Sequence, residues 1–234
     1  FMTQGAGPAS CAYWKMFESH MKDADFKDVH IIGTWVHGPG LIHANKEIRT
    51  PTDLDGVKIR GGSRVVNQLL EKLGATPVGM PVPAVSEALS KGVIDATTIP
   101  WEVTASLKVP ELVKNHTEFT GGALYNITFV LAMNKAKYDG LSAEAKAAID
   151  AHSGLDFSIF AGKTQEGADG PAREAAVALG NNIVTLTEAE TQIWRDTAQP
   201  IYASWIADMQ TKGIDGAALI KEAQDLQAGE CAGK

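Results

Sequence analysis

The sequence has few cysteines, no long apolar run and no excess of positive charge, and each absence excludes a class of protein. No stretch approaches the roughly 20 consecutive apolar residues that a membrane-spanning helix needs. The net charge of −7 gives no support for nucleic-acid binding, which normally uses a basic face. An acidic protein that captures an anion must therefore do so with a local positive site.

The two cysteines, Cys11 and Cys231, lie near opposite ends of the chain. They do not have the CxxC spacing of zinc or thioredoxin-like sites. Two interpretations stay open: a bridge formed in an oxidising compartment, or two unrelated small thiols. The sequence also has no GxSxG, HExxH, P-loop or GxGxxG motif, so the enzyme classes that these motifs mark are unsupported. We expect no catalytic residue, metal or cofactor.

Apolar residues make up 44% of the 234 residues, which is enough for a sizeable core in one large or two small domains. Short apolar segments and helical patterns alternate in the central part of the chain. The expected elements there are strands at 57–60, 76–80 and 93–99 and helices at 65–73 and 83–91. Gly74 and Gly92 follow the two helices, as is common at helix ends. This alternation is typical of a parallel α/β unit.

Longer elements are expected on either side of this unit. They are a helix at 12–22, a strand at 29–36, a helix at 101–114, a strand at 124–133 and a strand at 181–186. The apolar run at 124–133 is long enough to cross between two halves of the molecule. Thr187 and Glu190 have the spacing of a capping box, so a helix should begin there.

Arg60 is the most informative residue. It ends an expected strand and is followed by Gly61-Gly62-Ser63 at the start of a helix. Free backbone N–H groups and a positive dipole end gather at such a place. The planar guanidinium also matches a carboxylate in two parallel hydrogen bonds. The alternative is an arginine paired with a surface carboxylate.

Three other residues have a functional and a structural interpretation. Trp101 follows the next expected strand, where ligands gather in open α/β sheets, and it either stacks on a flat ligand or fills the core. Glu102 either accepts a hydrogen bond from a ligand hydroxyl or caps a helix electrostatically. His37, beside the Gly38-Pro39-Gly40 turn, either contacts a ligand or belongs to the loop.

Four segments resemble the substrate-binding proteins of TRAP transporters, the DctP family. They are 53–60 (DLDGVKIR), 73–78 (LGATPV), 88–96 (ALSKGVIDA) and 134–141 (NKAKYDGL). The resemblance covers essentially the whole chain. It implies a two-lobed, periplasmic-binding-protein-like α/β fold with parallel-rich sheets, crossing strands and a long helix. It also implies a periplasmic location, reached with a signal peptide that this chain does not include, and membrane subunits of a TRAP transporter as partners.

By this resemblance, residues 1–50 should form the remainder of lobe one and residues 51–123 should form lobe two. Residues 124–234 should supply the crossing strand, the helices and the returning segments that both lobes share. The family's first strand–helix–strand portion has no counterpart in the sequence. Lobe one should therefore look incomplete, with an exposed sheet edge or apolar surface. A missing N-terminal segment or a neighbouring chain would fill that gap.

The resemblance also implies a ligand class. Arg60 matches the family's carboxylate-binding arginine. Ile99 and Val82 stand where sugar-acid and dicarboxylate binders commonly have an asparagine and an aromatic residue, and Gly40 aligns with a second arginine of some members. These departures favour a small organic monocarboxylate with an apolar or aromatic body, such as a hydroxybenzoate, an aromatic keto acid or a branched 2-oxo acid.

The sequence therefore predicts a solute receptor. The expected ligand-binding residues are Arg60, Trp101, Ile99, Val82, His37, Trp35, Asn126 and Glu102. One alternative is a hydrolase- or lyase-type enzyme on a similar two-lobed fold, with His37 or Glu102 in acid–base work. Another is the effector domain of a regulator, which would normally be fused to a basic DNA-binding helix-turn-helix.

Overall fold

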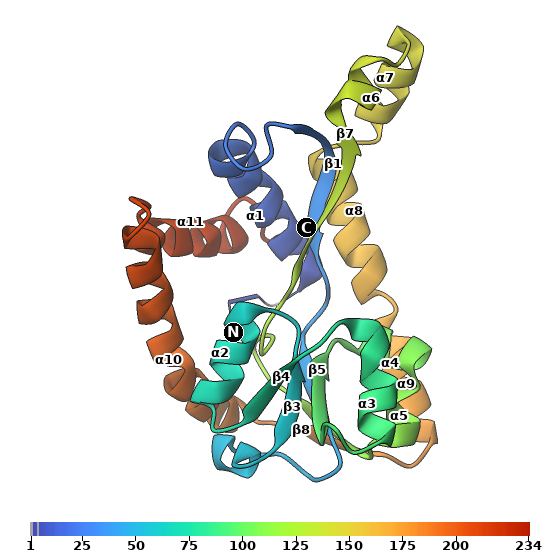
Figure 1. Cartoon of the computed structure of the whole chain (residues 1–234), viewed down its shortest axis with the longest axis vertical. Helices are drawn as coiled ribbons and strands as arrows, with labels where there is room; N and C mark the ends of the chain where they lie inside the picture. Colours follow the sequence, from blue (N-terminus) through green and yellow to red (C-terminus); the bar gives the residue numbers. More distant parts are fainter. Residues whose placement is uncertain (1, 4) are drawn as a thin grey trace.

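Two sheets organise the chain, whose computed structural model describes residues 2–3 and 5–234 (Figure 1). The smaller sheet pairs β1 (Val29–Val36) with β7 (Thr128–Asn134) antiparallel. The larger has six strands in the order β4-β3-β5-β2-β6-β8. Its strands are β2 (Leu41–Ala44), β3 (Lys58–Gly61), β4 (Thr76–Gly79), β5 (Ala96–Ile99), β6 (Asn115–Glu118) and β8 (Asn182–Thr185). We call the part around the small sheet lobe one and the part around the large sheet lobe two.

The predicted parallel unit is present in lobe two. β3 pairs parallel with both β4 and β5, and α2 (Arg64–Lys72) and α3 (Val85–Ser90) make the crossovers. Ser63 starts α2, because its side chain accepts a hydrogen bond from the backbone N–H of Val66 at 3.2 Å. Gly74 follows α2 with φ +95, a conformation that residues with a Cβ rarely adopt. Local chemistry therefore fixes how β3 passes into α2.

Several elements differ from the expectations; for example, the first helix begins at Ala6 and β5 begins at Ala96. The helix expected at 101–114 is two helices, α4 (Trp101–Leu107) and α5 (Val109–Leu112), because Lys108 adopts a left-handed conformation with φ 54. The strand expected at 124–133 begins only at Thr128. The antiparallel strands β2 and β6 were not predicted; each has four residues, too few for a clear alternating pattern. β2 joins the sheet of lobe two, although it lies within the segment expected to build lobe one.

The chain passes from lobe one to lobe two between β1 and β2, returns between β6 and β7, and crosses again from α8 (Leu155–Glu166) to α9 (Asp169–Ala178). A further crossing follows α10 (Glu188–Gln210) and brings α11 (Gly216–Ala228) back against α1 (Ala6–Met16). α8 packs on β1, and α9 packs on α4. Beyond β7, α6 (Lys135–Asp139) and α7 (Ala143–Ala151) project at the top of Figure 1.

The first and last helices are joined covalently. Cys11 in α1 (Ala6–Met16) and Cys231, just after α11 (Gly216–Ala228), form a disulfide with 5.7 Å between their Cα atoms. Both cysteines are fully buried, in a cluster with Leu155 and Leu226. A π-helical turn, Phe17–Met21, extends α1. The structure therefore agrees with the first interpretation of the cysteines, in which they form a disulfide.

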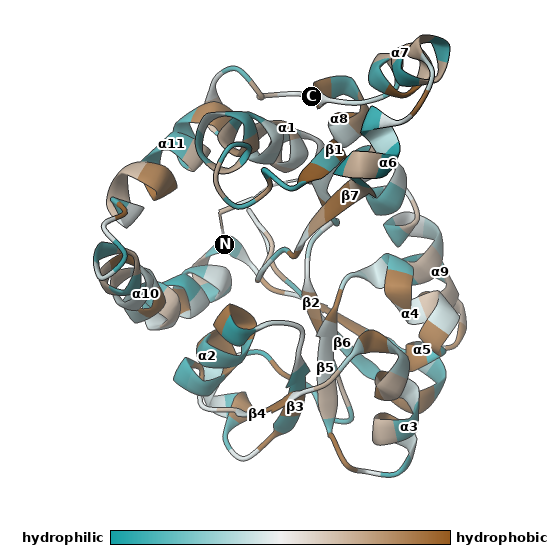
Figure 2. Ribbon diagram, turned by 45° about the horizontal axis from the view of Figure 1, so that its top comes forward, coloured by the Kyte–Doolittle hydropathy of each residue, from teal (hydrophilic) through white to brown (hydrophobic). Residues whose placement is uncertain are grey.

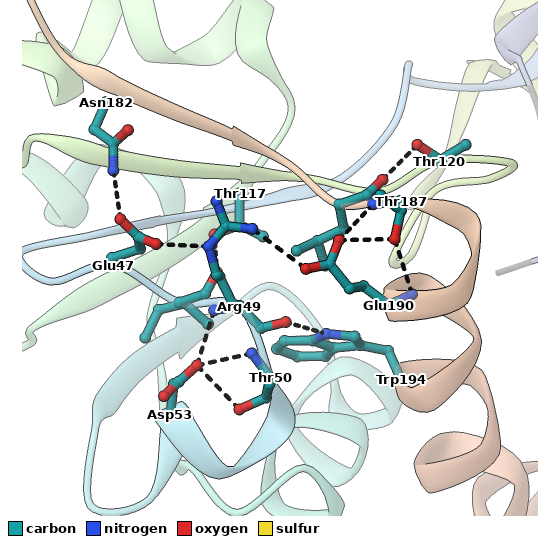
Figure 3. A network of polar contacts seen from close by, with 12 residues as sticks. Glu47, Arg49, Thr50, Asp53, Thr117, Thr120, Asn182, Thr187, Glu190 and Trp194 are labelled. Carbon is teal, nitrogen blue, oxygen red and sulfur yellow. Dashed lines mark hydrogen bonds and ion pairs between the residues drawn. The ribbon is translucent and has the colours of Figure 1, made fainter.

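The main core lies on the face of the large sheet that α2 and α10 (Glu188–Gln210) cover. Trp194 of α10 is fully buried, and its indole N–H donates to the Arg49 carbonyl at 2.9 Å. Figure 3 shows how the loop before β3 is bound to this helix: Arg49 pairs with Glu47 and Glu190. Glu190 also completes the predicted capping box with Thr187.

Lobe one presents an open sheet. Within residues 2–3 and 5–234, β1 and β7 pair only with each other. β7 is brown in Figure 2, and its Leu131 is 41% exposed. The exposed edge and apolar surface expected of lobe one are therefore both found. In the same described part of the chain, no helix combines the length and apolar character that crossing a membrane requires.

Candidate functional site

Arg60 lies at the carboxyl end of β3 and is 5% exposed. Its Nε donates to the Met80 carbonyl at 3.1 Å, and its Nη1 donates to the Thr98 carbonyl at 3.1 Å. Met80 directly follows β4, and Thr98 is the second-last residue of β5, so both carbonyls lie at the carboxyl ends of the strands next to β3. Among the described residues no carboxylate pairs with Arg60 and no acceptor meets its Nη2, and burial lowers the pKa of the guanidinium. The site thus holds a buried cation without a counter-anion, which is costly unless an anion binds.

The crossing segment before β7 reaches this guanidinium. Tyr125, in that segment, donates its hydroxyl to the Thr98 carbonyl at 2.9 Å, the same acceptor that Arg60 uses. Burial raises the pKa of the Tyr125 phenol to about 12, so the ring stays neutral. A Cβ on Gly62 would lie 3.3 Å from Nη1 of Arg60, so the glycine lets the backbone approach the guanidinium closely. Arg60 is therefore at the junction of the lobes.

His37 and Asn126 build the loop beside this junction. The His37 Nε2 accepts from the backbone N–H of Ile127 at 3.0 Å, so Nδ1 carries the proton and donates to the Gly38 carbonyl at 2.5 Å. Burial, and to a smaller extent the charge of Arg60, lower the His37 pKa. Asn126 donates to the His37 and Gly38 carbonyls. His37 is therefore neutral with both nitrogens bonded to backbone, which gives no support to an acid–base role.

Trp35 and Glu102 are brought together by a residue that the sequence did not indicate. The Trp35 indole N–H donates to Oε1 of Gln165 at 2.9 Å, and Nε2 of Gln165 donates to Oε1 of Glu102 at 2.6 Å. The Trp35 ring also stacks on Phe129, with centroids 5.5 Å apart. The backbone N–H of Glu102 donates to the Asp169 carboxylate at 2.7 Å. Trp35 and Glu102, both expected to contact a ligand, therefore form hydrogen bonds with other residues of the protein.

Trp101 lies in the core of lobe two and is 3% exposed. Its ring contacts His43 and His116 at centroid distances of 5.0 and 4.9 Å, and its indole N–H donates to Glu118 at 2.9 Å. These contacts agree with the interpretation of Trp101 as a residue of the core.

The two histidines under Trp101 form a directed chain of hydrogen bonds. The Ile99 carbonyl can only accept, so Nε2 of His43 donates to it at 3.1 Å and Nδ1 of His43 is an acceptor. Nδ1 of His116 therefore donates to Nδ1 of His43 at 2.7 Å, and Nε2 of His116 accepts from the Asn181 amide at 2.9 Å. Burial lowers the pKa of His43 to about 3 and that of His116 to about 4. The pair is neutral and holds the end of β5.

Ile99 lies at the carboxyl end of β5, and Val82 lies shortly after the carboxyl end of β4. Ile99 is the last residue of β5 and is 1% exposed, packed with Val109 and Val113. Val82 begins a 3-10 turn (Val82–Ala84) after β4 and is half-buried. Val82 is therefore partly exposed, whereas Ile99 is enclosed in the core of lobe two.

An apolar cavity of about 450 Å³ opens between α1, α2, α10, α11 and the crossing segment. Its lining includes Ser63, Val66, Tyr125, Asn126, Ile201 and Trp205. Tyr125 thus lines the cavity and also shares a carbonyl with Arg60. The volume lies within the range of small-molecule sites. Among the described residues that line this cavity, Asn126 is the one expected ligand-binding residue. Arg60 and His37 lie next to Tyr125 and Asn126 without lining the cavity, and Trp101 lies within lobe two.

Asp169 is a third residue of this region that the sequence did not indicate, after Tyr125 and Gln165. Its carboxylate lies at the start of α9, close to Gly38 and near Glu102 and Glu166. Burial, together with the neighbouring negative charges, raises the Asp169 pKa to about 7. Tyr125, Gln165 and Asp169 have no local signal in the sequence, since their partners lie far away along the chain.

Comparison with known proteins identifies the family. The sequence profile of the bacterial extracellular solute-binding proteins, family 7 (DctP), matches residues 12–208. A TRAP solute-binding protein of Rhodoferax ferrireducens T118, in complex with copurified benzoate, superposes with a TM-score of 0.94 and 44% identity over 97% of this chain and 71% of that one. A marine metagenome TRAP solute-binding protein specific for aromatic acids, with 3-hydroxybenzoate, gives 0.93 and 41% over 97% and 71%.

A curated relative agrees with these structures. The 2,3-diketo-L-gulonate-binding periplasmic protein YiaO of Escherichia coli K12 is 29% identical over 86% of this chain and 59% of its own length. The chain spans between 50% and 68% of the length of the curated relatives that it matches. The predicted two-lobed α/β fold and the resemblance to TRAP receptors are confirmed.

Proposed function

Because the chain belongs to family 7 of the bacterial extracellular solute-binding proteins, the solute receptors of TRAP transporters, we propose that it binds a small organic monocarboxylate through Arg60. The family serves transport rather than catalysis. The observation that carries the proposal is the buried guanidinium without a counter-anion. Two of its nitrogens are fixed on backbone carbonyls, so the group is held in place before a ligand arrives. A carboxylate would supply the missing acceptor for Nη2.

The charges around Arg60 favour a single carboxylate. His37 and Tyr125 are both neutral, so among the described neighbours Arg60 is the one cation at the junction. The second carboxylate of a dicarboxylate would lose its hydration there without gaining a partner.

Both the cavity and the relatives favour an aromatic body. The cavity of about 450 Å³ is lined mostly by apolar side chains. Two relatives at 44% and 41% identity bind benzoate and 3-hydroxybenzoate. We therefore assign the ligand to the aromatic monocarboxylates, with Asn126 bordering it, Val82 just after the carboxyl end of β4, and Trp101 and Ile99 supporting the site from within lobe two. Trp35, Glu102 and His37 then contribute through the junction of the lobes.

Membership of this family also suggests where the protein is located and which partners it has. Family members are periplasmic, and we place this receptor in the periplasm with the membrane subunits of a TRAP transporter as partners. The open edge of the β1–β7 sheet and the exposed Leu131 support further polypeptide as a partner of lobe one, from a preceding segment or a neighbouring chain.

Calorimetry with benzoate, 3-hydroxybenzoate and succinate tests the proposal. Arg60→Ala should weaken benzoate binding by about 2–5 kcal/mol, which is roughly 30-fold to several thousand-fold. Arg60→Lys keeps the charge but loses the fork, so it should recover only part of the loss. Arg64→Ala is the matched control, because Arg64 is exposed and pairs only with Asp208 at 3.4 Å among the described residues. Unchanged affinity in Arg60→Ala, or tightest binding of succinate, would overturn the assignment.

A further inference from the structure

Gln165 stands at the point where the lobes meet. It lies at the end of α8, two residues before Gly167, where that helix gives way to α9. Its amide contacts both lobes: the oxygen accepts from Trp35 of β1 in lobe one, at 2.9 Å, and the nitrogen donates to Glu102 of α4 in lobe two, at 2.6 Å.

The chemistry of the two partners leaves one orientation for the amide. The indole N–H of Trp35 can only donate, and an ionised Glu102 can only accept. The Gln165 oxygen must therefore face Trp35 and its nitrogen must face Glu102, since turning the amide over would lose both hydrogen bonds. The bond to Glu102 is charge-assisted and short, which makes it the stronger of the two.

Both ends of this bridge are held firmly. Trp35 stacks on Phe129 of β7, so its indole is fixed to the small sheet. The backbone N–H of Glu102 is bonded to Asp169 at the start of α9. The bridge therefore responds to the relative placement of β1, α4 and the α8–α9 connection rather than to a single flexible side chain.

We propose that Gln165 is a positioning residue, which fixes lobe one against lobe two and so sets how tightly a ligand on Arg60 is enclosed. The inference rests on the proposed function of the site and requires no contact between Gln165 and the ligand. When one arrangement of the lobes binds best, apparent affinity falls in proportion to the population of that arrangement. Breaking the bridge lowers that population.

An exchange of the two side chains gives a sharp test. Gln165→Glu places two carboxylates face to face, with Asp169 and Glu166 nearby, and should weaken benzoate binding by about tenfold. The double variant Gln165→Glu/Glu102→Gln restores the order of donors and acceptors. The new amide at 102 donates to the carboxylate at 165, which still accepts from Trp35. Its affinity should return to within about threefold of the original.

Gln192→Glu is the matched control. Gln192 donates to Asp196 at 2.7 Å on the exposed face of α10, so the same chemical change occurs there in a residue that bonds to neither Trp35 nor Glu102. It should leave affinity unchanged. Small-angle scattering of the ligand-free proteins should show a more open particle for Gln165→Glu and the original profile for the double variant. If Gln165→Glu does not fold, Glu102→Gln alone keeps a weaker amide–amide bond and should bind about threefold less tightly.

Two results would overturn the inference. One is a double variant that binds as weakly as Gln165→Glu, which would indicate general damage rather than a restored bridge. The other is unchanged affinity and scattering in Gln165→Glu. If the wild type binds benzoate and Arg60→Ala weakens it, while the Gln165 variants change nothing, only this inference fails. If Arg60→Ala changes nothing, the proposed function fails as well.

Discussion

Reduction of the Cys11–Cys231 disulfide should destabilise the protein substantially. The bridge joins residues 220 positions apart and fastens α11 to α1 inside a buried apolar cluster. In the chain-entropy account, closing a loop of this length removes about 5 kcal/mol of conformational freedom from the unfolded chain at 25 °C. Typical domains are stable by only about 5–15 kcal/mol, so this is a large fraction of the total.

The contacts that remain after reduction are too weak to compensate. Two polar contacts also join α1 and its extension to the C-terminal region: the ion pair Lys15–Glu230 at 2.6 Å and the hydrogen bond between His20 and Glu222 at 2.8 Å. Both are solvent-accessible, and exposed pairs typically contribute less than about 1 kcal/mol each. Apolar packing around Leu226 would hold α11 in place, but without the covalent bond.

Guanidinium unfolding with and without reductant measures the effect. The reduced protein and a Cys11→Ala/Cys231→Ala variant should unfold at similar, clearly lower denaturant concentrations than the oxidised protein. Alanine is chosen because a serine hydroxyl would be buried among apolar groups. An unchanged midpoint, with two free thiols confirmed by titration, would refute the reasoning. So would two alkylatable thiols in protein that was never reduced.

Two further predictions concern pH. The pKa values of His43 and His116 are lowered from 6.5 to about 3 and about 4, so the unfolded state binds more protons below pH 6.5. Stability should then fall between pH 6.5 and 4 by up to about 1.4 kcal/mol per unit for each histidine, and a His43→Leu/His116→Leu variant should lose most of this slope in urea titrations. The Asp169 pKa is raised from 3.8 to about 7, so its folded state holds the extra proton and its contribution to stability falls as pH rises through that window. Asp169→Asn keeps the acceptor for the backbone N–H of Glu102, so its free energy of unfolding should match that of the wild type at pH 4 and exceed it by about 1 kcal/mol at pH 8. The expected gain is modest because solvent still screens the carboxylate. Equal stability of the two proteins at both pH values would contradict this.

The sequence predicted the parts of the fold that local chemistry determines. Ser63 and Gly74 mark the limits of α2, and Thr187 with Glu190 marks the start of α10. Arg60 was also found this way, because the glycines after it indicate a strand that passes directly into a helix. In each case the residues that interact are neighbours in the chain.

The rest of the site depends on distant contacts, which a single sequence does not reveal. Trp101 was expected to meet a ligand, yet its partners are His43 and His116, on two short strands with no pattern of their own. Gln165 has no distinctive pattern in the sequence, and its role depends on Trp35 of β1 and Glu102 of α4, which contact it from the two lobes. The functions of such residues are set by tertiary packing rather than by propensity.

The return of the chain to lobe two has a consequence for how the protein assembles. β8 pairs parallel with β6, but the segment between them builds β7 and α6 to α8 before the chain comes back. Val184, Leu186 and Trp194 of the main core all follow that excursion. Lobe two therefore cannot complete its sheet or its core until much of lobe one has been synthesised. Pairings between such distant segments slow folding, so the edge of β6 that receives β8 should stay unpaired until the chain has returned to lobe two.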